Sequence, residues 1–131
     1  MRDRLLLQVF VTVGGLIPIA SGTAGIFLGP EFVGATIGTA ADSHFRYLSG
    51  LLLGLGLGFW STIPRIEANG TRFKLLTFFV FVGGLARLFS LVVVGIPPVG
   101  MLGALAMELG VTPLLCWWQH RLSRRLGSTT P

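Results

Sequence analysis

Charge is scarce in this chain. Charged residues make up 11% of its 131 residues, whereas hydrophobic residues make up 52%. A soluble domain carries about 25% charged residues, and water could not solvate a surface as poor in charge as this one. The composition therefore excludes an ordinary water-soluble domain and predicts a protein whose solvent is lipid.

Cysteine and histidine are nearly absent as well. Cys116 is the only cysteine, which excludes an intrachain disulfide and any paired-cysteine motif. Neither of the two histidines, His44 and His120, has a second histidine or a cysteine at ligand spacing, so we predict no metal site. No serine has a base in sequence reach that would activate it. We therefore identify no catalytic residue and no cofactor, and the sequence leaves open whether the protein is an enzyme.

Long apolar runs are what the chain has instead. Four of them are expected to form helices, at about residues 5–28, 45–63, 73–94 and 99–118, with a bend in the last at Pro113. A helix needs about 20 apolar residues to cross a hydrocarbon core of ~30 Å. We predict a single all-α domain over residues 1–131, folded as an integral membrane four-helix bundle.

The basic residues predict an orientation. The chain has 10 Lys and Arg against 5 Asp and Glu, and eight of the ten lie in the N-terminal head, in the connection 64–74 and after residue 118. The positive-inside rule then places both termini and the central connection in the cytoplasm. Three tryptophans at the same helix ends fit an interfacial aromatic belt: Trp60, Trp117 and Trp118. Since topology explains the basic clusters, we predict no nucleic-acid partner.

Glycines mark the expected packing faces. Gly50, Gly54 and Gly58 stand at i, i+4 and i+8 of the second helix, and such a stripe lets another backbone come close. Gly83 and Gly84 give the third helix a similar surface. We predict that these glycines pack against helices of the bundle or of a partner.

Charged residues within the apolar part are the candidate site. Arg87 and Glu108 are expected about 12 Å and 15 Å from the outer ends of two antiparallel helices, at 1.5 Å per residue, and can therefore meet. An ion at this depth costs at least ~2.5–3.5 kcal/mol unless it is paired or hydrated. We therefore expect both side chains to face the interior of the bundle.

Two interpretations of these charges stay open. In the first, Arg87 and Glu108 form an ion pair that fixes the helix register. Asp42 then pairs with Arg46 across one helical turn. In the second, Arg46 and Arg87 converge on an anionic group, such as a lipid phosphate, a carboxylate or a quinone oxygen, while Glu108 orients an arginine or relays a proton. His44, expected near the outer surface, is either a ligand residue or simply solvated.

A family resemblance rests on four pieces of the chain. These are DSHFRYLSG at residues 42–50, GGLAR at 83–87, GIPP at 95–98 and Glu108. They resemble a bacterial domain-of-unknown-function family of small four-helix membrane proteins, over nearly the whole chain. A looser resemblance, in size and helix pattern, is to DoxX-type membrane proteins. The resemblance implies a bacterial inner-membrane protein and favours one site formed by Arg46, Arg87 and Glu108, but it supplies no activity and no catalytic residue.

The sequence therefore predicts a small multi-pass inner-membrane protein with a polar pocket in the outer-leaflet half. Its expected role is that of a lipid- or partner-binding module or an accessory subunit, with membrane lipids, a homo-oligomer or a larger membrane complex as partners. Two alternatives are a quinone-interacting membrane redox component and a small oligomeric transporter.

Overall fold

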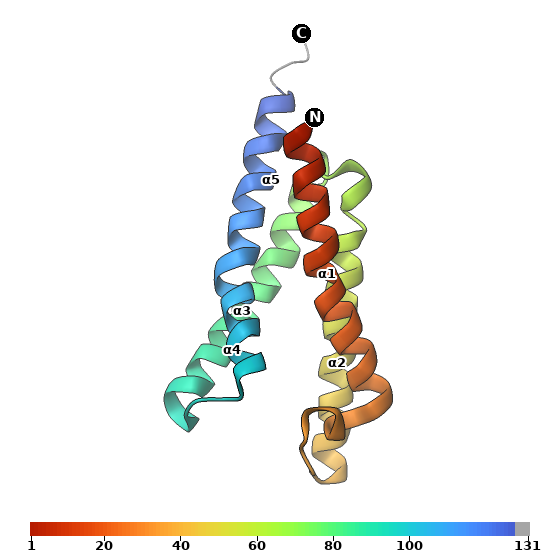
Figure 1. Ribbon diagram of the computed structural model, residues 1–131, viewed down its shortest axis with the longest axis vertical. Helices are drawn as coiled ribbons and strands as arrows, with labels where there is room; N and C mark the ends of the chain where they lie inside the picture. Colours follow the sequence, from red (N-terminus) through yellow and green to blue (C-terminus); the bar gives the residue numbers. More distant parts are fainter. Residues whose placement is uncertain (128–131) are drawn as a thin grey trace. The chain divides into compact units, whose positions relative to one another are not determined.

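The computed structural model describes residues 1–127, and every regular element in that range is helical. The elements in chain order are α1 (Arg2–Leu28), the 3-10 turn η1 (Gly29–Val33), α2 (Thr39–Trp60), the 3-10 turn η2 (Ile63–Arg65), α3 (Gly70–Val94), α4 (Val99–Ala106), the π-helical turn η3 (Met107–Val111) and α5 (Thr112–Gly127) (Figure 1). The predicted all-α class is confirmed.

Four stretches of the described chain are long and apolar enough to cross a membrane. They are Arg2–Val33, Thr39–Arg65, Gly70–Val94 and Val99–Leu126, the last being α4, η3 and α5 in one continuous helix. At most 22% of the residues in their apolar windows are buried within the structure. Apolar side chains that are left this exposed suit lipid or a partner protein better than water.

The helices are longer than the apolar runs. The second helix begins at Thr39, earlier than the predicted residue 45, and ends at Trp60 instead of residue 63. Gly38 precedes it with an extended backbone, and Asp42 lies in its first turn, where the positive end of the helix dipole favours a carboxylate. The helix therefore starts among polar and small residues that a hydropathy criterion passes over.

The other predicted bounds need the same correction. α1 begins at Arg2 instead of residue 5, α3 begins at Gly70 instead of residue 73, and α5 runs to Gly127 instead of residue 118. Leu, Gln and Arg in the last segment are good helix formers, so hydrogen bonding continues past the last apolar residue. Hydropathy locates the membrane-crossing part of a helix and underestimates the length of the helix itself.

Contacts divide the chain into two compact units, so the single-domain bundle stays a prediction. Unit 2 is Val9–Ile63, and unit 1 is formed by Met1–Gln8 together with the chain from Pro64 onward. In unit 2, α1 and α2 pack antiparallel through small residues (Figure 1). A Cβ on Gly22 would lie 2.6 Å from the backbone nitrogen of Leu53, and a Cβ on Gly56 would lie 2.7 Å from Ile19. Backbones this close require glycine.

Two glycines of the predicted stripe do not take part in this contact. A Cβ on Gly50 or on Gly54 would meet nothing within 4 Å. Packing of the stripe against a partner therefore stays a prediction. The α1–α2 contact instead uses Ser49, Gly56 and Trp60, whose indole nitrogen donates a hydrogen bond of 3.1 Å to a carbonyl of α1. The spacing of glycines alone did not identify the face that packs against α1, since α2 also carries glycine or leucine on its other faces.

Unit 1 is built around an antiparallel pair, α3 and the fourth helix. Gly84 is buried, and a Cβ there would lie 2.7 Å from the side chain of Leu109. A Cβ on Gly83 would meet nothing within 4 Å, so packing of Gly83 against a partner stays a prediction. The first turns of α1 also belong to unit 1 and contribute to a small core with the start of α3 and with α5. The most buried side chains of this core are Leu7, Ile66, Phe73, Gln119 and Leu122.

Candidate functional site

Arg87 and Glu108 form an ion pair between α3 and η3. Arg87 Nε donates to Glu108 Oε2 at 3.0 Å, and Arg87 Nη2 donates to Glu108 Oε1 at 3.2 Å. The Arg87 side chain is 35% exposed and the Glu108 side chain is 18% exposed. A two-point guanidinium–carboxylate contact fixes geometry as well as charge. The predicted meeting of these residues is thus observed, while any role in ligand binding stays a prediction.

The helix changes its hydrogen bonding where it carries Glu108. Met107–Val111 is a π-helical turn, in which the Thr112 backbone N–H bonds to the Met107 carbonyl, and the Thr112 hydroxyl donates to the same oxygen at 2.9 Å. Pro113 explains the change, because it has no N–H to offer and its ring would clash with the carbonyl four residues earlier. The predicted bend at Pro113 takes the form of a widened turn, and such turns are frequent at functional sites.

Arg46 has a different environment, at the junction of α1 and α2. Its Nε and Nη2 donate to both carboxylate oxygens of Asp42, at 2.9 and 3.3 Å. Its Nη1 donates to the carbonyls of Ile26 and Phe27, which end α1. Gly29 adopts φ +70, and a Cβ there would collide with the guanidinium. All three nitrogens of Arg46 are thus engaged, and the side chain caps the end of α1.

The surroundings of Arg46 include a small pocket in unit 2. The pocket has a volume of about 190 Å³ and is lined by Asp42, Arg46 and residues of the α1–α2 connection, including Glu31 and Thr36. His44 is exposed and does not line it; its ring centroid lies 6.3 Å from that of Tyr47. Arg46 belongs to unit 2 and Arg87 to unit 1, so their convergence on one anion stays a prediction. Within residues 1–127, no group of three or more acidic, histidine or cysteine side chains could hold a metal.

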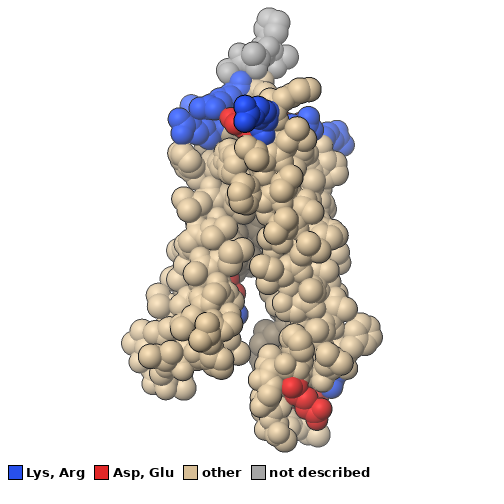
Figure 2. Space-filling model, in the orientation of Figure 1, with Lys and Arg blue, Asp and Glu red and all other residues tan. Residues whose placement is uncertain are grey.

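The predicted basic clusters all belong to unit 1 and gather at one end of it. These clusters are in the N-terminal head, the 64–74 connection and α5. Figure 2 shows lysines and arginines gathered in a band at one end, with few charged atoms elsewhere on the visible surface. Arg4 Nε lies 3.1 Å from Glu67 Oε2, and its Nη2 donates to the Pro64 carbonyl at 3.0 Å. Gln119, fully buried, donates to the Ile66 carbonyl at 2.8 Å. These bonds tie the three segments together.

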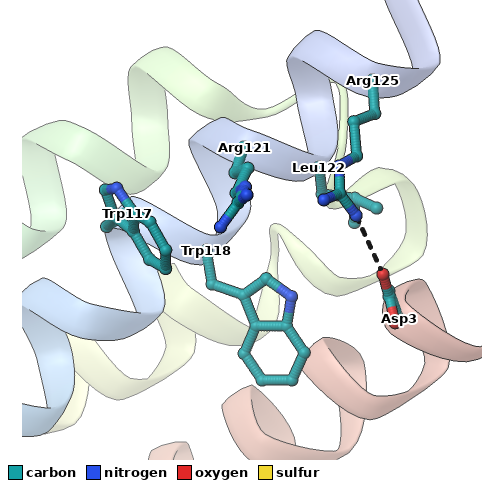
Figure 3. Close-up of a pocket in the computed structure, with 6 residues that line it drawn as sticks. All are labelled: Asp3, Trp117, Trp118, Arg121, Leu122 and Arg125. Carbon is teal, nitrogen blue, oxygen red and sulfur yellow. Dashed lines mark hydrogen bonds and ion pairs between the residues drawn. The ribbon is translucent and has the colours of Figure 1, made fainter.

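A second pocket, also of about 190 Å³, opens within this basic end (Figure 3). It is lined by Asp3 from α1 and by five residues of α5, which are Trp117, Trp118, Arg121, Leu122 and Arg125. From the sequence, these tryptophans are expected to form an aromatic belt and these arginines to set the topology, and no pocket is expected at this place. The signal that could have revealed it is the i, i+4, i+8 spacing of residues 117, 121 and 125 on one helix face.

Comparison with known proteins gives a family and no activity. No curated protein and no solved structure matches the chain. The looser resemblance to DoxX-type proteins and the bacterial origin therefore stay predictions. Residues 6–119, which include α2, the Arg87–Glu108 pair and both tryptophans of α5, match a known family along their whole length, and the chain accordingly belongs to the family described as domain of unknown function DUF4345.

Proposed function

We propose that this protein is a multi-pass protein of the bacterial inner membrane, with both termini and the 64–74 connection in the cytoplasm. Its role is that of a lipid- or partner-binding module or an accessory subunit. One observation supports the proposal most strongly. Arg46 and Arg87 each form an ion pair with a carboxylate of the same unit, whereas the other basic residues lie together at one end of unit 1.

The internal pairing argues against chemistry in the apolar part. Arg46 is paired with Asp42, and Arg87 is paired with Glu108, each through two nitrogen–oxygen contacts. A transport path or a proton relay needs polar groups that exchange partners, and pairs that are doubly bonded within one unit fit a structural role better. The basic end has the composition of a surface that meets the anionic cytoplasmic leaflet.

The test of orientation is cysteine labelling with a membrane-impermeant maleimide on whole cells. In a Cys116→Ser background, single cysteines replace the exposed residues Thr36, Ala68 and Ile96, one in each connection. We expect Thr36→Cys and Ile96→Cys to label on intact cells, and Ala68→Cys to label only after permeabilisation. The reverse pattern would overturn the orientation, and recovery of the protein in the soluble fraction would overturn the membrane assignment.

Two further measurements separate the proposed role from its alternatives. A quinone absorbance in the purified protein, lost in Arg87→Leu, would replace the binding module with a redox component. A substrate flux across liposomes, abolished by Glu108→Gln, would replace it with a transporter. We expect neither signal, because the guanidinium and the carboxylate concerned already bind each other.

A further inference from the structure

The pocket at the basic end has the chemistry of an anion site. We propose that it binds the phosphate of an anionic phospholipid headgroup, held between Arg121 and Arg125 and resting on Trp117. The proposal deepens the proposed function, because it requires this end of unit 1 to lie at a membrane surface. Free phosphate shares the chemistry of the headgroup, and the experiment below distinguishes the two.

Arg121 is held in place without using its hydrogen-bond donors. Its guanidinium carbon lies 5.2 Å from the centroid of the Trp117 ring, a cation–π contact. Within residues 1–127, it has no hydrogen bond and no ion pair. Figure 3 shows the side chain beside the two tryptophans and facing the pocket. A guanidinium with five N–H donors is thus positioned and available to an incoming acceptor.

Arg125 is held by a contact that a ligand can replace. Its Nη1 lies 3.4 Å from Asp3 Oδ2, and the two side chains are 59% and 55% exposed. Because both partners are exposed to solvent, an ion pair of this kind is weak, and an incoming anion can compete with Asp3 for the guanidinium. The carboxylate of Asp3 itself lines the pocket and repels an anion, but with two arginines present the pocket keeps a net positive charge. Residues four apart on a helix have Cβ atoms about 5–6 Å apart, so one phosphate can reach both guanidinium groups.

The position of the pocket along α5 selects a lipid over a free anion. Before it, the fourth stretch is apolar from residue 99 to residue 116, apart from Glu108 and Thr112. After it, six of the seven residues 119–125 are polar or charged. Trp117 stands at this transition and is 59% exposed. Exposed tryptophan is characteristic of the level of lipid headgroups. The phosphate of a lipid would lie beside Arg121 while its acyl chains lie along the apolar part of α5.

Native mass spectrometry of the detergent-purified full-length protein tests the proposal, with phosphatidylglycerol, phosphatidylcholine and inorganic phosphate as separate probes. We expect phosphatidylglycerol to bind with one preferred stoichiometry and more tightly than phosphatidylcholine. Arg121→Gln should weaken phosphatidylglycerol binding at least about tenfold, the effect of losing a charge-assisted contact. Arg121→Lys, which keeps the charge but not the planar fork, should fall between.

Lys74→Gln is the matched control, because it removes one exposed positive charge from the same end of unit 1 without touching the pocket. We expect it to change binding less than about twofold. Equal losses in Arg121→Gln and Lys74→Gln would mean attraction to the whole basic end and would overturn the pocket. Inorganic phosphate that binds as tightly as phosphatidylglycerol would overturn the lipid assignment, and the absence of any binding would overturn both.

Two checks keep the outcomes separable. Melting temperatures of all variants should agree with the unaltered protein, since Arg121 is exposed; if Arg121→Gln does unfold, Arg125→Gln replaces it with the same expectation. Cysteine labelling repeated in Arg121→Gln should give the unaltered orientation. Loss of lipid binding with intact labelling supports the pocket, whereas reversed labelling in the unaltered protein removes the proposed function itself.

Discussion

Removing one partner of the Arg87–Glu108 pair should cost more stability than removing both. Arg87→Leu leaves the Glu108 carboxylate, whose side chain is only 18% exposed, without its two guanidinium contacts. An unpaired ion at bilayer depth costs about 2.5–3.5 kcal/mol, and breaking a buried pair typically costs about 3–5 kcal/mol. We therefore expect Arg87→Leu to lower the free energy of unfolding by about 3 kcal/mol.

The double variant Arg87→Leu, Glu108→Leu should recover most of that loss. Replacing a buried ion pair by apolar residues is often neutral or stabilising, so the expected loss is about 1 kcal/mol or less. The coupling energy obtained from the two single variants and the double variant should then be at least about 2 kcal/mol, within the range seen for residues in direct contact. Glu108→Gln should fall between, because the amide oxygen still accepts a hydrogen bond but carries no charge.

The assay is unfolding in mixed micelles with an increasing fraction of denaturing detergent, followed by far-UV circular dichroism. Lys74→Leu serves as a control, since it also exchanges one positive charge for leucine but at an exposed position outside the pair. We expect the control to lie within about 0.5 kcal/mol of the unaltered protein. Additive losses of the two single variants would refute the pairing, and an unchanged stability of Arg87→Leu would refute the burial of the charge.

Three further predictions concern stability in the same assay. Gln119→Leu removes a fully buried hydrogen bond to the Ile66 carbonyl and should cost about 1–3 kcal/mol, the penalty of an unsatisfied acceptor. Gly22→Ala places a Cβ 2.6 Å from the backbone of α2 and should cost about 1–3 kcal/mol, whereas the matched Gly54→Ala, in open space, should be neutral or stabilising. Arg46→Leu leaves the last carbonyls of α1 without their cap and should cost about 1–3 kcal/mol, with increased amide exchange at that end of the helix.

The helices and the ion pair could be predicted because each follows from one strong constraint. Apolar runs of membrane-crossing length leave few alternatives to helix, since every backbone group must be bonded internally in lipid. The four-residue connection from Gly95 to Pro98 forces the flanking helices to be antiparallel neighbours, and the rise of 1.5 Å per residue then brings Arg87 and Glu108 to similar depths. The short connection between these two helices was therefore enough to predict that Arg87 and Glu108 meet.

The packing faces could not be predicted with the same rule. In a soluble protein, polar residues reveal the outer face of a helix, but a helix surrounded by lipid is apolar on all sides. The stripe Gly50–Gly54 and the true contact at Gly56 therefore look alike in sequence. What decides between them is the partner helix, in which Gly15 and Gly22 face Trp60 and Leu53. The pocket on α5 escaped prediction for a related reason, since one of its lining residues, Asp3, lies over a hundred positions away in the sequence.

Two arginines show how the surroundings decide what a charged residue can do here. Arg46 lies in a stretch that is long and apolar enough to cross a membrane, and all three of its nitrogens are bonded to a carboxylate or to carbonyls. Arg121 lies where α5 becomes polar, and water or a headgroup can satisfy it, so the fold leaves its donors unused. The same side chain is therefore structural in one place and available in the other. Substitution of Arg46 should lower stability, and substitution of Arg121 should lower lipid binding with stability unchanged.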